Sequence, residues 1–348
     1  MRFLKAYINL KKEDAMWIDI FLLFLSLAVI LLSCELFTNG IEWLGKKLKV
    51  GDGVVGSIFS AVGTCLPETT IPIIAILFSK SASPDIGIGA IAGAPFMLST
   101  LAFFVTGVAV LGFSKRRKTG FKMNVNNKVL SRDIGFFIVV YTLGIGISFV
   151  RIDSLRHLTA LFLLACYIFY VFRTIKDDNE SHVELESLYL VKLLKKRPTM
   201  GFILFQVILA LAGIILGADM FVNNIENVSK LFGLSPLVLS LIITPIATEL
   251  PEKFNSVIWI SKKKDTLALG NISGAMVFQS CIPVSIGLLG TSWILDTKVI
   301  ISAMLALLSS LTTYLWIKVK GELNPIPLLI GGVFYTIFLA FLISQGFK

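Results

Sequence analysis

Two short motifs place carboxylates inside apolar stretches of this sequence. Residues 63–68 read G-T-C-L-P-E and residues 247–252 read A-T-E-L-P-E. An ionised side chain in hydrocarbon costs at least about 2.5–3.5 kcal/mol on insertion scales, so it is rarely present without a partner or a pathway to serve. A kinked helix with a hydrogen-bonded acid would explain one such motif. Two copies favour a functional pair, Glu68 and Glu252.

Each motif can gather several oxygen atoms around its carboxylate. The proline has no N–H to donate to the carbonyl four residues earlier, so that oxygen lacks its helical hydrogen bond. The threonine precedes the glutamate by four residues, so on a helix the hydroxyl and the carboxylate share a face. Hard cations such as Ca²⁺ take about six to eight oxygen ligands, and two ionised glutamates would balance the charge. The expected oxygen ligands are Gly63, Thr64, Glu68, Ala247, Thr248 and Glu252.

Long apolar segments must hold these motifs. The chain of 348 residues is 55% hydrophobic and 16% charged, with a mean hydropathy of +0.84, which excludes a water-soluble domain. Runs of about 20 apolar residues, each long enough to cross a bilayer, recur along it. They predict ten spans near residues 18–36, 54–78, 86–113, 134–150, 158–172, 201–221, 237–260, 267–289, 299–317 and 326–343.

Basic residues indicate how the chain is oriented. The formal net charge of +10 lies in the loops between spans, so it gives no support to nucleic-acid binding. Loops after odd-numbered spans carry 21 lysines and arginines, and the other side carries 10. The positive-inside rule then predicts a multi-pass cell-membrane protein with both termini outside, although four basic residues before the first span oppose this. We expect no removable signal peptide.

The sequence contains an internal repeat. Residues 35–68 align without a gap with residues 219–252, at an offset of 184, and eleven of the thirty-four positions are identical. The offset spans five crossings, so the second copy must enter the membrane from the opposite side. We therefore predict an all-α fold of two inverted five-helix repeats, residues 1–175 and 199–348, joined by a cytoplasmic linker, residues 176–198. Their motifs lie in residues 54–100 and 237–285.

Further prolines fall within the predicted spans. Pro72 and Pro95 lie in spans two and three, and Pro245 and Pro283 lie in spans seven and eight. Helices broken at these positions around a site in the middle of the membrane would fit this distribution, although each proline alone could mark a simple kink.

The duplicated motifs resemble the repeats of the cation/Ca²⁺ exchanger superfamily, and most closely its Na⁺/Ca²⁺ antiporter branch, whose hallmark is G-T-S-x-P-E. The resemblance covers nearly the whole chain. It implies that Glu68 and Glu252 coordinate Ca²⁺ and share Na⁺ or proton binding, and that Thr64 and Thr248 complete the sites. It also implies alternating access, in which the first and sixth spans move past the others.

The sequence departs from the family pattern at several ligand positions. Cys65 and Glu249 replace the hallmark serine in the two copies. The family's next span carries a G-N-x-x-G-S-N signature with polar ligands. In the first copy, Ala94 and Leu98 occupy the positions of those ligands. The second copy keeps Asn271 and offers Ala275 and Gln279 at the ligand positions. Coupling to protons, or transport of another divalent cation, therefore remains an alternative to Na⁺/Ca²⁺ exchange.

Glu249 and Lys253 lie four residues apart in one span, a spacing that favours an ion pair. We hypothesise that the two charges neutralise each other, or that the ammonium occupies a vacated Na⁺ position as a tethered cation. In the alternative, Glu249 is an additional ligand and Lys253 snorkels to the interface. We expect Cys65, Lys253 and Asn271 to modulate the site, with Glu249 and Gln279 among its ligands.

Other functional classes find little support. The sequence has no HExxH motif and no histidine placed to pair with a serine or cysteine, so we do not expect an enzyme. The four cysteines lack CxxC spacing, and we expect no cofactor. The expected partners are the lipid bilayer and the transported cations, and a monomer suffices. A passive cation channel is a further alternative, but an inverted repeat is typical of alternating access.

Overall fold

The computed structural model describes residues 2–48, 65–78, 84–117, 120–177, 187–194 and 197–346. Within these ranges the chain is helical, apart from turns and one antiparallel bridge between Met123 and Leu323. It forms two compact units, which cut across the predicted repeats. Unit 1 comprises Met1–Gly87 with Glu180–Leu239, and unit 2 comprises Ile88–Asn179 with Ser240–Phe347. The repeat boundaries themselves stay a prediction.

Eight helical segments in the described ranges are long and apolar enough to cross a membrane. They are α1 (Arg2–Lys47), α5 (Pro84–Met97) with α6 (Phe103–Phe113), α7 (Asn127–Gly146), α8 (Asp153–Asp177), α10 (Met200–Phe232), α12 (Asp265–Gly290), α13 (Thr297–Lys320) and α14 (Pro325–Ser344). Shorter apolar helices at Leu66–Phe78 and Pro236–Glu249 occupy the second and seventh predicted spans. The all-helical membrane class is thus confirmed. The number of ten spans stays a prediction, since residues 49–64 lie outside the described ranges.

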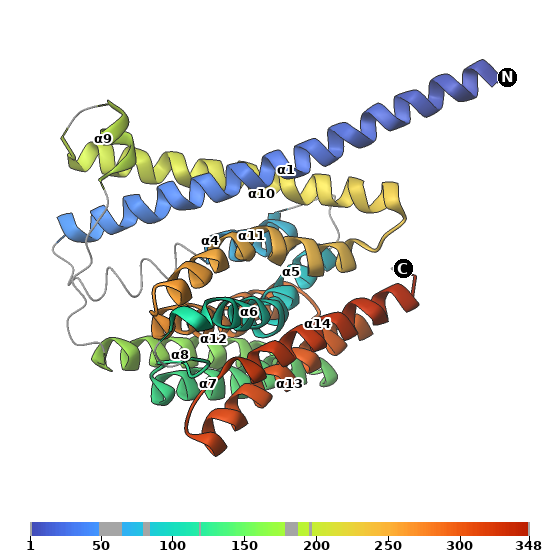
Figure 1. The fold of residues 1–348 in the computed structure, drawn as a ribbon. Coiled ribbons are helices and arrows are strands. Elements are labelled where there is room, and N and C mark those ends of the chain that lie inside the picture. The colour runs from blue at the N-terminus through green and yellow to red at the C-terminus, as the bar shows by residue number, and fades with distance from the viewer. Residues whose placement is uncertain are drawn as a thin grey trace. The chain divides into compact units, whose positions relative to one another are not determined.

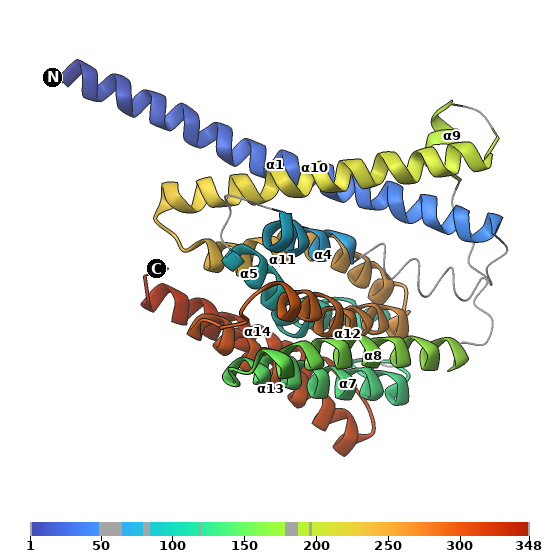
Figure 2. The same ribbon diagram turned by 180° about the vertical axis from the view of Figure 1, so that it is seen from behind.

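In unit 1, α1 and α10 pack side by side and run antiparallel (Figures 1 and 2). Two glycines of α10 permit a close approach. A Cβ on Gly213 would meet Ser33, and a Cβ on Gly217 would lie 2.9 Å from Ile30 Cγ1 and 3.2 Å from Val29 Cγ1. The contacts with Ser33 and Val29 correspond to each other. At the offset of 184, Ser33 matches Gly217 and Val29 matches Gly213, so the second contact repeats the first with the helices exchanged.

The predicted linker contains a short helix, α9 (Tyr189–Leu194), which is fixed to the α1–α10 pair. The amide of Gln206 donates to Asn39 Oδ1 at 3.0 Å and accepts from the backbone N–H of Leu190 at 2.9 Å. The backbone N–H of Tyr189 also donates to Asn39 Oδ1, at 3.1 Å. Leu188 and Val191 pack with Ile203 beneath these bonds. The linker residues 187–194 are therefore an ordered part of unit 1.

In unit 2, α12 is the most deeply buried helix of the described spans. It packs against α7 and α8, and two of its buried serines are hydrogen-bonded to these neighbouring helices. Ser273 Oγ donates to Asp133 Oδ2 at 3.0 Å, and Ser285 Oγ donates to the carbonyl of Ala160 at 3.1 Å. Because hydrocarbon offers no hydrogen-bond partner, such groups must be satisfied by neighbouring helices.

Two of the predicted broken helices contain π-helical turns. Pro72 in α4 (Leu66–Ile73) precedes the π-helix η2 (Ile74–Phe78), and Pro95 in α5 precedes the π-helix η3 (Leu98–Ala102). Ser309 Oγ of α13 donates to the carbonyl of Ser99 in η3 at 2.6 Å, which supplies that carbonyl with a partner from a neighbouring helix. By contrast, α11 (Pro236–Ser261) and α12 continue through Pro245 and Pro283 without interruption.

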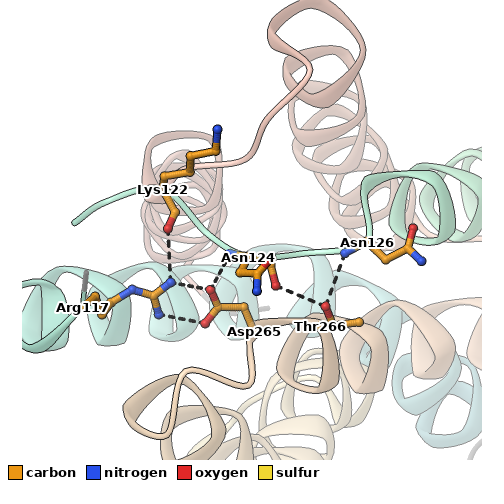
Figure 3. Close-up of polar contacts among 6 residues, drawn as sticks. All are labelled: Arg117, Lys122, Asn124, Asn126, Asp265 and Thr266. Atoms are coloured by element: carbon orange, nitrogen blue, oxygen red, sulfur yellow. Dashed lines mark hydrogen bonds and ion pairs between the residues drawn. The ribbon is translucent and has the colours of Figure 1, made fainter. Parts of the chain in front are cut away.

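Three connections of unit 2 meet at one end of its helices: those between α6 and α7, α11 and α12, and α13 and α14. Arg117, directly after the 3₁₀ turn Ser114–Arg116 that follows α6, forms a buried bidentate ion pair with Asp265 at the start of α12, with Nη1 to Oδ1 at 2.7 Å (Figure 3). The N–H of Asn124 donates to Asp265 Oδ2, and the N–H of Asn126 donates to Thr266 Oγ1 (Figure 3). Asp265 therefore organises this end of the unit.

Polar caps set the boundaries of the helices at this end. The side chain of Asn126 accepts from the N–H of Val129 at the start of α7, and Asn324 accepts from the N–H of Ile326 at the start of α14. Gly321 ends α13 with φ +68°, a left-handed conformation that glycine adopts at little cost. At the opposite end, Trp293 Nε1 donates to the carbonyl of Gly144 at 2.8 Å, which joins the α12–α13 connection to the end of α7.

Replacing Arg117 with methionine will leave the Asp265 carboxylate buried without its charge partner. Removing one partner of a buried pair costs about 3–5 kcal/mol, so we expect a loss of that size in the free energy of unfolding of the purified protein in detergent. The control is Lys122→Met, which opens the exposed Lys122–Glu322 pair of the same loops and should cost less than about 1 kcal/mol.

A double variant, R117M/D265L, removes both buried charges and should recover part of the loss. Similar, small losses for Arg117→Met and Lys122→Met would contradict the organising role of Asp265.

Candidate cation-binding site

The first motif begins α4, and its glutamate is buried. Cys65 occupies the N-cap position, Pro67 lies at the start of the helix, and Glu68 lies in the first turn with 3% of its surface exposed. Proline suits this position because the first N–H groups of a helix have no intrahelical acceptor. The same unpaired N–H groups favour a carboxylate in the first turn. Gly63 and Thr64 lie outside the described residues.

The second motif lies within the continuous helix α11. Thr248 is fully buried, and its Oγ1 donates to the carbonyl of Thr244 at 2.9 Å. Because the hydroxyl oxygen keeps its lone pairs while it donates this bond, it can still act as a ligand of a cation. Ala247 is half-buried, and Glu249 is 2% exposed. The backbone of Glu252 is helical, but its side chain lies outside the described part of the structure.

Lys253 is buried rather than directed to the membrane interface. Its side chain is 2% exposed, and Nζ donates to Asn271 Oδ1 of α12 at 3.0 Å. The structure thus brings together two residues that we expected to modulate the site, and it places a cationic group on the motif asparagine of the second copy. The snorkelling alternative does not describe this side chain.

Gln279, which lies eight residues after Asn271 in α12, is also fully buried. Within the described part of the chain, neither its Oε1 nor its Nε2 has a hydrogen-bond partner. A buried amide in this condition is rare and points to a group held for a ligand or an ordered water. Gln279 occupies a predicted ligand position, and its Oε1 is a suitable ligand for a hard cation.

The corresponding positions of the first copy are apolar in the structure as well as in the sequence. Ala94 in α5 and Leu98 in η3 are both buried and offer no side-chain oxygen. Hydroxyls do occur nearby along the same span, but Ser99 Oγ donates to the carbonyl of Pro95 at 2.7 Å. Among the described residues, no group of three or more His, Cys, Asp and Glu side chains is placed to hold a metal ion.

The predicted residues divide between the two units. Glu68 and Cys65 belong to unit 1, whereas Thr248, Glu249, Lys253 and the α12 residues belong to unit 2. Within unit 2, the Lys253–Asn271 bond joins α11, directly after its motif residues 247–252, to α12. How Glu68 and Glu252 are arranged with respect to each other stays a prediction.

The sequence analysis missed one buried acid, Asp133. This residue accepts from Ser273 Oγ at 3.0 Å and pairs with Arg132 at 3.1 Å, and it is 3% exposed. We expected the fourth span to begin after it, at residue 134, whereas α7 begins at Asn127. The signal that could have found it is a lone acid directly before an apolar run, beside a compensating arginine.

Comparison with known proteins adds independent information. The sequence model of the family described as "Sodium/calcium exchanger protein" matches residues 18–176 and 202–347. These two stretches make up most of the chain.

The chain belongs to this family. Members of the family are secondary transporters, so the expectation that the chain is not an enzyme is confirmed. The resemblance to the cation/Ca²⁺ exchanger superfamily is confirmed as well.

One relative and two solved structures illustrate the similarity. A putative antiporter, CaxA of Alkalimonas amylolytica, is 26% identical over 81% of this chain and 86% of its own length. The crystal structure of the H⁺/Ca²⁺ exchanger CAX is similar with a TM-score of 0.69 over 93% of this chain and 82% of that one, at 13% identity. The sodium-calcium exchanger NCX_Mj gives 0.57 over 93% and 98%, at 21% identity. Both structures share the fold of this chain.

Replacing Lys253 with methionine tests the tethered-cation hypothesis. Methionine keeps most of the apolar stem of the side chain but removes the ammonium from Asn271, so a mobile monovalent cation can take its place. We expect the Na⁺ concentration that drives half-maximal ⁴⁵Ca²⁺ uptake into proteoliposomes to change roughly tenfold, the equivalent of about 1.4 kcal/mol. Lys262→Met, at an exposed lysine beyond the end of α11, is the matched control. An unchanged ion dependence in Lys253→Met would reject the hypothesis.

Proposed function

We propose that this family member exchanges Ca²⁺ for Na⁺ across the membrane by alternating access, with Glu68 and Glu252 as the Ca²⁺ ligands. The observation that carries the proposal is the duplicated L-P-E motif in apolar helices, whose first glutamate is 97% buried in α4. A carboxylate kept in such surroundings serves a partner or an ion pathway.

Two independent observations support an inverted repeat. The stretches matched by the family model begin at residues 18 and 202, which are 184 residues apart, the same offset that aligns the motifs. The α1–α10 contacts at Ser33–Gly213 and Val29–Gly217 are exchanged by that offset, as a two-fold relation between the helices requires. We therefore propose two copies of a five-helix unit with opposite orientations.

The contacts at the ends of the unit 2 helices support successive spans that cross the membrane in opposite directions. The connections after the third, seventh and ninth predicted spans meet around Asp265 and the Met123–Leu323 bridge. The connection after the eighth span meets the end of the fourth span through Trp293 and Gly144. Loops that follow odd-numbered spans thus lie together in this unit. We propose that they face the cytoplasm, with both termini outside.

The ligand set that we propose consists of oxygen atoms. The carboxylates of Glu68 and Glu252 would neutralise a divalent cation, and the hydroxyls of Thr64 and Thr248 would complete its shell. The carbonyls of Gly63 and Ala247 and the side chains of Glu249 and Gln279 extend the set. The unpaired buried amide of Gln279 favours its inclusion.

The division into units supports a moving part. The helices of the first and sixth predicted spans, α1 and α10, pack on each other within unit 1, together with α4 and α9. Most of the second copy belongs to unit 2. We propose that the α1–α10 pair moves as one body during transport, because separating the two closely packed helices would lose their packing contacts.

Proton coupling is the second candidate. The buried, apolar side chains of Ala94 and Leu98 remove two oxygen ligands that the family resemblance assigns to Na⁺, and Lys253 places a fixed cation on Asn271. A site with fewer neutral oxygens and an additional carboxylate, Glu249, can exchange protons for a divalent cation. The fold is shared with both a H⁺/Ca²⁺ exchanger and a sodium-calcium exchanger, so the fold alone does not favour either ion.

The coupling ion can be measured directly. Purified protein in proteoliposomes should take up ⁴⁵Ca²⁺ under an outward Na⁺ gradient at a rate well above that of protein-free liposomes. A pH gradient imposed in the absence of Na⁺ tests the second candidate in the same vesicles. Uptake driven by neither gradient would reject Ca²⁺ antiport, and loss of a Ca²⁺ gradient without an opposing ion would instead indicate a channel.

Removing either motif carboxylate should abolish exchange while the fold persists. Glu68→Gln and Glu252→Gln keep the side-chain volume and delete the charge, so we expect ⁴⁵Ca²⁺ uptake to fall at least about 100-fold, the equivalent of roughly 2.7 kcal/mol in each case. Glu322→Gln, at an exposed glutamate of the α13–α14 connection, is the control and should keep its rate. Normal exchange by both motif variants would remove the basis of the proposal.

A further inference from the structure

A hollow of about 550 Å³ lies between α7 and α13 of unit 2, at the end where Asp265 joins the loops. Three of its lining residues are basic, and none of the lining residues is acidic. The lining comprises Asn127, Lys128, Ser131, Arg132, Gly135, Tyr314, Ile317, Lys318 and Gly321. We call it the α7–α13 pocket. It contains no residue of the proposed Ca²⁺ site.

The pocket keeps a surplus of positive charge. Lys128 and Lys318 are exposed at its rim, and Lys318 Nζ lies 5.5 Å from the centre of the Tyr314 ring. Of the nearby acids, Asp133 pairs with Arg132 at 3.1 Å, and Glu322 pairs with Lys122 at 2.6 Å. The first turn of α7 also contains no acidic residue, so the partial positive charge of the helix N-terminus adds to that of the lysines.

The walls of the pocket are fixed before any ligand arrives. Asn127 Nδ2 donates to the carbonyl of Gly321 at 2.7 Å, which ties the start of α7 to the end of α13. The preceding residue, Asn126, donates from its N–H to Thr266 Oγ1 (Figure 3). On the floor, Tyr314 lies against Gly135, where a Cβ would be 3.1 Å from the ring. Ligand pockets are usually largely formed in this way before the ligand binds.

Exposed apolar side chains continue from the pocket along both helices. On α7, Val139 and Leu143 follow Gly135 at steps of four residues and are exposed. On α13, Leu311 precedes Tyr314 by three residues and Met304 lies two turns further, and both are exposed. Residues at these spacings share one helix face. A ligand seated in the pocket would therefore meet basic groups at the helix ends and an apolar surface beyond them.

We propose that the α7–α13 pocket binds the phosphate headgroup of an anionic phospholipid, whose acyl chains lie along the apolar faces of α7 and α13. Basic pockets between membrane helices on the cytoplasmic side suit such headgroups, and the loop charges predict that this end is cytoplasmic. The apolar continuation distinguishes a lipid from a free phosphate ion, which would gain nothing from Val139 or Leu311.

Lipid retention by the full-length protein tests the proposal. Native mass spectrometry of the purified protein in detergent, with equal amounts of phosphatidylglycerol and phosphatidylcholine, measures the affinity for each. We expect selective phosphatidylglycerol binding that weakens roughly tenfold or more in the double variant K128Q/K318Q, since each lysine near an anionic surface contributes about fivefold. The control K115Q/K262Q removes the same charge from exposed lysines outside the pocket and should bind like the wild type.

Competition by inorganic phosphate distinguishes the two sources of the phosphate group. Millimolar phosphate should leave phosphatidylglycerol in place. Displacement by phosphate would show a free-anion site and overturn the lipid assignment. Equal losses in both double variants would show attraction to net charge alone, and equal binding of the two lipids would show no headgroup recognition. Either result would also overturn the proposal.

Discussion

The hydrocarbon interior offers no hydrogen-bond partner, and this constraint shapes the buried polar groups in the part of the chain that the structure describes. Buried hydroxyls along α12 bond to neighbouring helices, and the π-helical carbonyl of Ser99 is bonded by Ser309 from α13. At the loop end of unit 2, the same rule makes Asp265 the acceptor for a guanidinium and a backbone N–H together. Polar groups that remain without a protein partner therefore stand out.

Gln279 stands out in this way, and it lies on the same helix as Asn271, which holds the Lys253 ammonium. We propose that the site has been rebuilt. Asn271, which the second copy keeps from the family signature, contacts a cation that is part of the chain, and Gln279, at a predicted ligand position, would present its amide to a ligand from outside. Such a rebuilt site can keep the exchange of a divalent cation while changing what it is exchanged for, which is why the coupling ion needs its own experiment.

The sequence predicted what depends on neighbouring residues. The helical class, the buried Glu68 and the burial of Thr248 and Glu249 follow from apolar runs around short motifs. Contacts between distant segments were not predicted. Arg117 and Asp265 are 148 residues apart, and nothing local identifies either as the partner of the other. Asp133 was placed in a loop because a charged residue next to an apolar run is usually taken as the end of a membrane span. The compact units also differ from the repeats, since similarity between two segments does not say which helices pack together.

The matched contacts of α1 and α10 have a thermodynamic consequence. Ser33 meets Gly213, whereas its counterpart Gly217 meets Val29, so the two halves of the contact differ in chemistry. In a transporter built on a perfect two-fold axis, the states open to either side of the membrane would have equal free energies. Each substitution that differs between the copies lifts this degeneracy. In the alternating-access mechanism that we propose, the imperfect repeat would thereby give the molecule a resting side, even with equal solutions on both faces.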